Sequence, residues 1–191
     1  EKIHVMVEEA CKGLAGVSAS QVEIQSGIQF YDGITTAAIQ EILIKSASDL
    51  ISLDNPNYQY VAARLLLYAI RKSLYGRLWE LPHLYDHITD CVKKEVYDSD
   101  ILVKYSKEEI EILDDIIDHD RDFLFTYAGL RQVADKYLVQ DRSSGQVYET
   151  PQFMYLLIAM TIFADYPKET RINYVTRYYA AISKHKINIP T

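Results

Sequence analysis

The sequence predicts a mainly α-helical protein with one small β-hairpin. Apolar residues recur at a spacing of three and four along most of the 191 residues, which is typical of helices with one buried face. Two capping boxes, Ser18 to Gln21 and Ser106 to Glu109, mark the starts of helices. The one strong β pattern is residues 137–149, where two short apolar and aromatic runs flank a Ser-Ser-Gly turn. The expected strands are too few for a sheet protein.

Composition limits the classes of function. Hydrophobic residues make up 49% of the chain, enough for a sizeable core, and Cys11 and Cys91 form no zinc or disulfide pattern. The net charge of −7 argues against non-specific binding to nucleic acid. No apolar run approaches the ~18 residues that span a bilayer, and we see no secretory leader. We therefore expect a cytoplasmic protein that binds neither nucleic acid nor a membrane.

Four helices are expected in the first 76 residues, which form the first compact unit. The first helix ends at Gly13 or Gly16, the second follows the Ser18 capping box, and Thr35 or Thr36 caps the third. Their expected ranges are 2–14, 19–30, 35–53 and 55–76.

The fourth of these helices is the most apolar. Asn55 is the expected cap and Pro56 the first helical residue, while Gly76 supplies the stop. Arg71 and Lys72 lie in the last turn, where they complement the helix dipole or form an anion site, and both alternatives are open. The apolar stripe consists of Tyr58, Val61, Ala62, Leu65, Leu66 and Ala69.

The second half is also expected to be helical, after a linker at 77–82. The Ser106 capping box opens one helix, and Thr150-Pro151 opens the helix that follows the hairpin. The expected helices are 84–95, 108–117, 127–136, 152–164 and 169–184.

Candidate catalytic and metal-binding groups are few. His83 and His87 are spaced to share a helix face, but no third ligand accompanies them, so a surface pair is favoured and no metal is expected. The Asp118–Asp122 stretch, with His119 and Arg121, is expected to tie a helix end by salt bridges. Tyr178 and Tyr179 are expected in core or subunit packing. We assign no catalytic residue.

One set of residues suits a polyphosphate. Lys2 and Thr36 lie at the starts of helices, where free N–H groups attract anions, and Lys72 lies near the end of another. In a four-helix unit, two helix starts and one helix end can meet at one rim. The alternative is that these residues are ordinary caps and dipole partners, and no glycine-rich phosphate loop is present.

An ordered set of short strings resembles the N-terminal part of the class Ia ribonucleoside-diphosphate reductase large (alpha) subunit. The resemblance covers essentially the whole chain, and its specificity lies in the order of the set. The strings are SQVE (20–23), IQFYDGI (28–34), DLIS (49–52), YQYVAARL (58–65), LYDH (84–87), IDHDRD (117–122), KYLVQDR (136–142) and YPKETR (166–171).

The resemblance implies two domains. Residues 1–76 correspond to the four helices of an ATP-cone, which binds ATP as activator and dATP as inhibitor and lacks here its N-terminal hairpin. Residues 77–191 correspond to the helical domain that precedes the α/β barrel. The catalytic cysteines belong to that barrel, and neither Cys11 nor Cys91 matches one of them. The chain, which opens without methionine, is expected to be a piece of the large subunit that is inactive by itself.

The resemblance also implies roles for individual residues. Lys2 and Lys72 match phosphate-binding lysines of the cone, and Thr36 matches a threonine that contacts the nucleotide. Gln40 stands where related enzymes often have histidine, which puts that contact in doubt, although an amide can still form hydrogen bonds. The other matches are Ile3, Ile39 and Tyr68, which line the base or sugar, and Thr191, which contacts the ribonucleotide substrate.

The implied partners are those of the whole enzyme. They are the barrel that completes the large subunit, a second large subunit, the small radical-generating subunit and the ribonucleoside diphosphate substrate. ATP and dATP are the implied effectors, and no catalytic cofactor is implied in this segment. The alternatives are a degenerate cone or an all-α interaction domain without nucleotide binding. Without the upstream hairpin, weak nucleotide binding is expected.

Overall fold

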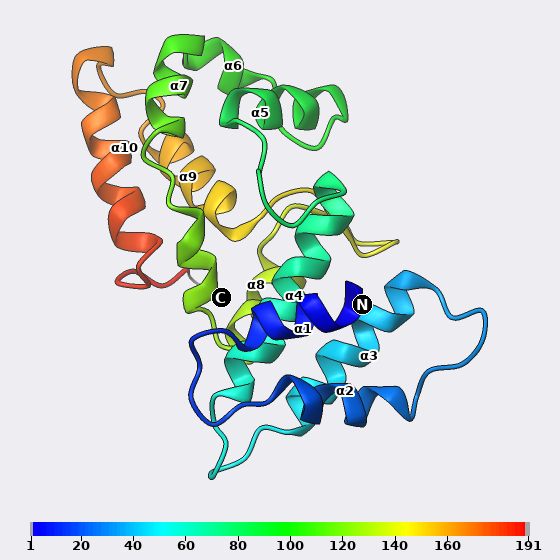
Figure 1. Cartoon of the computed structure of the whole chain (residues 1–191). Helices are drawn as coiled ribbons and strands as arrows, with labels where there is room; N and C mark the ends of the chain where they lie inside the picture. Colours follow the sequence, from blue (N-terminus) through cyan, green and yellow to red (C-terminus); the bar gives the residue numbers. More distant parts are fainter. Residues whose placement is uncertain (1, 190–191) are drawn as a thin grey trace. The chain divides into compact units, whose positions relative to one another are not determined.

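A computed structural model describes residues 2–189, except for the side chain of Lys2, and confirms a mainly helical fold with one two-stranded sheet (Figure 1). Thr191 lies outside the described residues. The helices are α1 (Lys2–Cys11), α2 (Ala19–Gly27), α3 (Thr36–Asp49), α4 (Tyr58–Tyr75), α5 (Leu84–Lys93), α6 (Asp100–Lys104), α7 (Lys107–Asp114), the 3-10 helix η1 (His119–Leu124), α8 (Tyr127–Lys136), α9 (Pro151–Ile162) and α10 (Lys168–Ile182). The strands are β1 (Gln140–Asp141) and β2 (Gln146–Val147).

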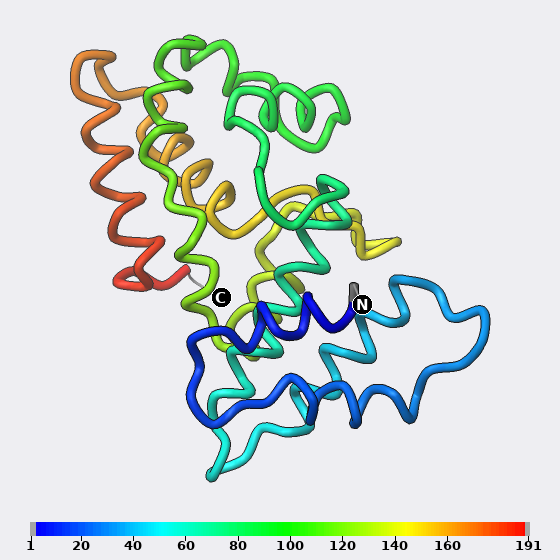
Figure 2. Tube along the Cα trace, in the orientation of Figure 1, coloured from blue at the N-terminus to red at the C-terminus, as the bar shows by residue number. Residues whose placement is uncertain are grey.

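The packing contacts divide the chain into two units. Unit 1 comprises Glu1–Leu78 and Phe123–Lys136, and unit 2 comprises Trp79–Asp122 and Tyr137–Thr191. The path of the chain in Figure 2 shows how the second unit is built from two separate stretches of sequence. The sequence pattern gave no indication that Phe123–Lys136 packs with the first unit.

In unit 1, α4 is the central helix. It packs against α1, α3 and α8, while α2 packs against α1 and α3. Burial of a large apolar side chain contributes roughly 1.5–3 kcal/mol, so this helix contributes much of the unit's core. Its buried residues are Tyr58, Val61, Ala62, Ala63, Leu65, Leu66, Leu67, Tyr68, Ile70 and Arg71.

The end of α4 follows the sequence prediction, but its start does not. Gly76 ends the helix in the left-handed conformation (φ 69°), and its N–H donates to Lys72 O at 2.9 Å. The helix begins at Tyr58, after Asn57, rather than at Asn55 and Pro56. Asn57 instead uses its side-chain amide to bind Ala15 O at 2.8 Å, which ties the start of α4 to the preceding loop.

The prediction of a capping box at Ser18 is also wrong. Ser18 is the cap residue of α2, but its side chain makes no capping hydrogen bond. Its backbone N–H donates to Tyr58 Oη at 3.0 Å, and Tyr58 in turn donates to Gln21 Oε1. A tertiary contact with α4 therefore replaces the local cap.

Phe123 holds the second stretch of unit 1 against α4. The Arg71 and Arg64 guanidiniums lie 5.3 and 5.9 Å from its ring centroid. The Tyr68 ring packs edge-to-face against it, with the two ring centroids 6.2 Å apart. Cation–π contacts of this kind contribute about 0.5–2 kcal/mol each. They explain why a segment distant in sequence belongs to unit 1.

In unit 2, α5 packs against α7, and α10 packs against both α9 and α7. The capping box of α7 is confirmed: Ser106 Oγ accepts from Glu109 N–H at 3.3 Å, and the Glu109 carboxylate accepts from Ser106 N–H at 2.9 Å. The hairpin is confirmed as well, with Gln140 opposite Val147. The short helices α6 and η1 were not expected from the sequence.

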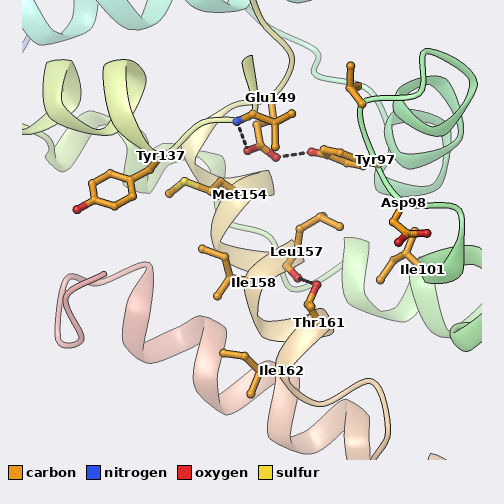
Figure 3. A pocket seen from close by; sticks show the side chains of 12 residues that line it. Tyr97, Asp98, Ile101, Tyr137, Glu149, Met154, Leu157, Ile158, Thr161 and Ile162 are labelled. Carbon is orange, nitrogen blue, oxygen red and sulfur yellow. Dashed lines mark hydrogen bonds between the residues drawn. The ribbon is translucent and has the colours of Figure 1, made fainter. Parts of the chain in front are cut away.

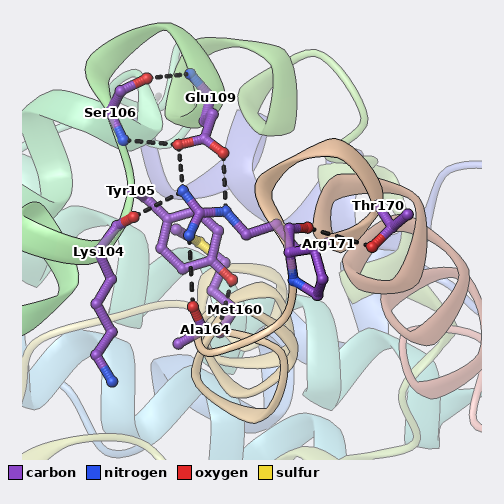
Figure 4. A network of polar contacts seen from close by, with 9 residues as sticks. Lys104, Tyr105, Ser106, Glu109, Met160, Ala164, Thr170 and Arg171 are labelled. Carbon is purple, nitrogen blue, oxygen red and sulfur yellow. Dashed lines mark hydrogen bonds and ion pairs between the residues drawn. The ribbon is translucent and has the colours of Figure 1, made fainter.

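A buried ion pair joins α7 to α10 (Figure 4). Arg171 is 3% exposed, and its Nε and Nη2 donate to the two carboxylate oxygens of Glu109 at 2.8 and 2.5 Å. Nη2 also donates to Lys104 O at 2.7 Å, and the guanidinium lies 4.4 Å from the Tyr105 ring. The guanidinium therefore joins α10 to both α6 and α7, and this fixes the orientation of α10 within unit 2.

We expect Glu109→Gln to lower the free energy of unfolding by about 3–5 kcal/mol, because it leaves the Arg171 charge buried without its counter-charge. A glutamine still completes a capping box, so the loss reports the ion pair. Asp90→Asn is the matched control, since the Asp90–Lys94 pair is exposed and worth less than about 1 kcal/mol. Urea denaturation measures both, and equal effects would contradict the prediction.

Candidate nucleotide-binding site

The helices of unit 1 place the candidate phosphate ligands at helix ends. Lys2 is the first residue of α1, Thr36 is the first residue of α3, and Lys72 lies in the last turn of α4. Both α1 and α3 pack against α4, so the three positions belong to one packed unit. The side chain of Lys2 lies outside the description.

Thr35 and Thr36 divide two tasks at the start of α3. Thr35 is the cap, and its Oγ1 accepts from Ala38 N–H at 3.2 Å. Thr36 is exposed, and its hydroxyl has no hydrogen bond to another described residue. The hydroxyl of Thr36 is therefore available to a ligand, next to the free N–H groups of the first turn.

Arg71 and Lys72 also separate. Arg71 is 3% exposed, and its Nη1 donates to Leu78 O at 3.5 Å. Lys72 is exposed and forms no ion pair with any described residue. The structure thus removes Arg71 from the anion-site alternative and leaves Lys72 as the accessible cation.

The expected base or sugar contacts differ in accessibility. Ile3, Ile39 and Gln40 are half-buried, whereas Tyr68 is 2% exposed. Gln40 Nε2 is buried and has no hydrogen-bond partner among the described residues. It can therefore donate a hydrogen bond to a ligand. Tyr68 lies in the core of unit 1, and burial raises its pKa.

His4 is a feature of this region that the sequence analysis missed. Its Nδ1 lies 2.8 Å from Glu23 Oε1 on α2, and its Nε2 lies 3.2 Å from Glu8 on α1. The hydrogen bond to Glu23 is the main cause of a raised His4 pKa. His4 follows Lys2 by two residues and ties the first turn of α1 to α2. Its spacing of four from Glu8 was the available signal.

His83, the cap residue before α5, and His87 within that helix do not form the expected surface pair. His83 is exposed and lies 2.6 Å from Asp114 Oδ2, but His87 is 3% exposed and stacks on Phe153 with ring centroids 4.2 Å apart. Burial lowers the pKa of His87 to about 4, so the imidazole is neutral. Within residues 2–189 no group of three or more His, Cys, Asp or Glu could hold a metal ion.

The other residues considered for catalysis, namely the Asp118–Asp122 stretch, Tyr179 and the two cysteines, make contacts that stabilise the fold. Arg121 Nε pairs with Asp118 at 3.1 Å, and buried Asp122 accepts from Gln152 Nε2 at 2.9 Å. Tyr179 is buried and donates to Gln152 Oε1 at 2.8 Å, which agrees with the core packing expected of it. Both cysteines are free, and burial raises the pKa of the Cys91 thiol to about 12, so it is a poor nucleophile.

A buried polar chain runs through unit 2 next to His87. His87 Nε2 lies 3.0 Å from Tyr97 Oη, and Tyr97 donates to Glu149 Oε2. Val139 N–H donates to Glu149 Oε1 at 2.8 Å. Burial raises the pKa of Glu149 to about 7, against the opposing effect of these two hydrogen bonds. No local pattern in the sequence indicates that this glutamate is buried.

Comparisons with known proteins identify the class. The model of the ATP cone domain matches residues 1–73, and the model of the ribonucleotide reductase all-alpha domain matches residues 123–191. The candidate phosphate ligands Lys2, Thr36 and Lys72 all lie within the cone match. An ATP cone joined to this all-alpha domain defines a nucleotide-binding segment of a ribonucleotide reductase.

Individual relatives define the subunit. The chain is 51% identical over 191 residues to ribonucleoside-diphosphate reductase 1 subunit alpha of Escherichia coli (strain K12), and 50% identical to subunit alpha of Haemophilus influenzae. It is 46% identical over 178 residues to subunit alpha of Enterobacteria phage T4. The alignments with the two bacterial proteins cover all of this chain but only 25% of each relative. The alignment with the phage protein covers 92% of this chain and 23% of the relative. The chain belongs to the ribonucleoside-diphosphate reductase alpha-subunit family and spans about a quarter of the length of these relatives.

No helix in the described part of the chain is long and apolar enough to cross a membrane. This finding agrees with the absence of a long apolar run in the sequence.

We expect His4 to titrate above its ordinary pKa of 6.5, since its protonated ring is stabilised by Glu23 and Glu8. NMR titration of the imidazole measures this pKa in the wild type and in Glu23→Gln. Loss of the Glu23 charge and acceptor should bring the pKa back toward 6.5. Glu41→Gln is the control, because Glu41 is an exposed acid of α3 that no contact links to His4. A wild-type pKa at or below 6.5 would contradict the prediction.

Glu149 should make stability fall as pH rises. Its folded pKa of about 7 lies above the ordinary 4.5, so the folded state retains a proton that the unfolded state has lost. Ionisation of the buried carboxyl group lowers the free energy of unfolding by about 3 kcal/mol. This loss is absent below pH 4.5 and complete above pH 7.

Glu149→Gln removes this titration. Urea denaturation from pH 4.5 to 8 should therefore show the variant gaining about 3 kcal/mol relative to the wild type. A difference between the two proteins that does not change with pH would contradict the buried, proton-binding state of Glu149.

Proposed function

We propose that this chain is the N-terminal part of a ribonucleoside-diphosphate reductase alpha subunit and that unit 1 carries the site where ATP and dATP set overall activity. The observation that carries the proposal is the exposed Lys72, which lies in one packed unit with the starts of α1 and α3, inside the ATP-cone match.

The chemistry of these positions suits a polyphosphate. The first turns of α1 and α3 present unpaired N–H groups and the positive end of the helix dipole. Lys72 adds a mobile ammonium group, and Thr36 adds a hydroxyl that can donate to a phosphate oxygen. We assign the second ammonium group to Lys2.

Three half-buried residues of α1 and α3 suit an adenine base. Ile3 and Ile39 offer apolar surface, and the Gln40 amide supplies a donor with no partner among the described residues. A purine ring nitrogen would accept that hydrogen bond and remove the cost of a buried unsatisfied donor, which is about 1–3 kcal/mol. Tyr68 supports this surface from the core.

The reductase reaction is proposed for the whole enzyme and not for this segment. Neither Cys11 nor Cys91 has the surroundings of a reactive thiol, since burial raises the pKa of both. We therefore assign radical reduction of ribonucleoside diphosphates to the barrel of the large subunit, working with a second large subunit and the small radical-generating subunit. Thr191 is the proposed substrate contact at the mouth of that barrel.

Regulation would follow from linkage. If ATP and dATP prefer different assemblies of the subunits, each shifts the assembly equilibrium by its differential affinity for the two forms. The alternative of a degenerate cone predicts no nucleotide binding at all.

Lys72→Ala should weaken ATP and dATP binding at least tenfold, because a charge-assisted phosphate contact contributes about 1.5–3 kcal/mol. Isothermal titration of the intact alpha subunit that contains this segment measures the effect. Lys45→Ala is the matched control, since Lys45 is an exposed lysine on α3 that pairs with Asp49 instead. A wild type that binds neither nucleotide, or equal losses in both variants, would contradict the proposal.

A further inference from the structure

Unit 2 contains a cavity that the nucleotide site does not involve. It has a volume of about 420 Å³, within the range of about 300–1,000 Å³ that holds small molecules. Its walls come from α6, α9, the segment after α5 and the residues that flank the hairpin (Figure 3). The cavity lies wholly within one unit, so its geometry depends on unit 2 alone.

Most of the cavity wall is apolar. Met154, Leu157, Ile158 and Ile162 extend along α9, and Ile101 faces them from α6 (Figure 3). Met154 is buried at one end, whereas Ile162 is half exposed, so the cavity opens toward solvent at the end of α9. Such a wall binds the apolar body of a ligand by excluding water.

The deep end of the cavity contains the Glu149 carboxyl group. Glu149 is 2% exposed, and its two oxygens accept from Tyr97 Oη and Val139 N–H. A carboxylate oxygen has two acceptor positions, so each oxygen can accept one further hydrogen bond. Figure 3 shows the hydrogen bond that joins the Tyr97 hydroxyl to the Glu149 carboxyl group.

No cation in the described part of the chain compensates this carboxylate. None of the described residues forms an ion pair with Glu149, and no lysine or arginine lines the cavity. The second acid of the lining, Asp98, is exposed and is drawn near Ile101 in Figure 3. A buried carboxylate without a counter-charge is costly, and a bound cation would remove that cost.

We propose that this cavity binds a small organic ammonium ion, with its apolar body along α9 and its charged nitrogen at the Glu149 carboxylate. A primary ammonium group matches the site because it donates three hydrogen bonds and accepts none. The matching neutral alcohol satisfies the acceptors but leaves the charge uncompensated. Burial raises the pKa of Glu149, and a cation beside the carboxylate would lower it again.

The test is titration of the chain with 2-phenylethylammonium at pH 8, followed by NMR. At this pH Glu149 is ionised and the amine still carries its charge. We expect saturable shifts at the cavity residues and binding at least tenfold tighter than that of 2-phenylethanol. Glu149→Gln should weaken amine binding at least tenfold and leave the alcohol unaffected.

Two further variants separate the cavity from general electrostatics and from misfolding. Asp98→Asn removes the exposed acid of the same lining and should change the affinity less than twofold. Ile158→Trp fills the cavity while it keeps Glu149, and it should abolish binding of both compounds. If the amine binds no better than the alcohol, if its shifts lie elsewhere, or if Asp98→Asn matches Glu149→Gln, the proposal is overturned. Failure of nucleotide binding in unit 1 has no bearing on this result.

Discussion

Burial of α4 is the constraint on which the rest of unit 1 depends. The helix packs against α1, α3 and α8, and ten of its 18 residues are buried. A helix surrounded in this way has its rotation about its own axis fixed, because any turn would expose apolar surface at about 25 cal/mol per Å². That rotation directs Arg71 to the Phe123 ring and Lys72 to solvent. The accessible charge of the proposed nucleotide site is thus set by hydrophobic packing.

The two units use charge in different ways. In unit 1 the proposed ligands of the phosphates lie at helix ends, where a cation can stay exposed and meet an anion from solvent. In unit 2, two charged side chains are buried. Arg171 is paired with Glu109, whereas Glu149 has no cation beside it among the described residues. The Arg171–Glu109 pair stabilises the packing of α10 against α7. The Glu149 carboxylate has no counter-charge among the described residues and is left for a ligand.

The sequence predicted the elements better than their tertiary contacts. Helical periodicity, the Ser106 capping box and the Ser-Ser-Gly turn are local signals, and each corresponds to an element of the structure. The five residues of α6 are too few to show a period. The burial of His87 depends on stacking with Phe153, and the backbone N–H of Ser18 is bound by Tyr58. Both contacts join residues distant in sequence, so neither could be inferred from sequence neighbours. Lys72 was singled out by position and resemblance, but only packing shows that Arg71 is unavailable.

The most direct test of the nucleotide site is hydrogen–deuterium exchange of the intact alpha subunit with and without dATP. Amides in the first turn of a helix lack intrahelical partners and exchange quickly unless a ligand accepts their hydrogen bonds. The account predicts slower exchange on nucleotide binding at the first turns of α1 and α3 and around the end of α4. Unchanged exchange at these three places, with dATP shown to be bound, would contradict it.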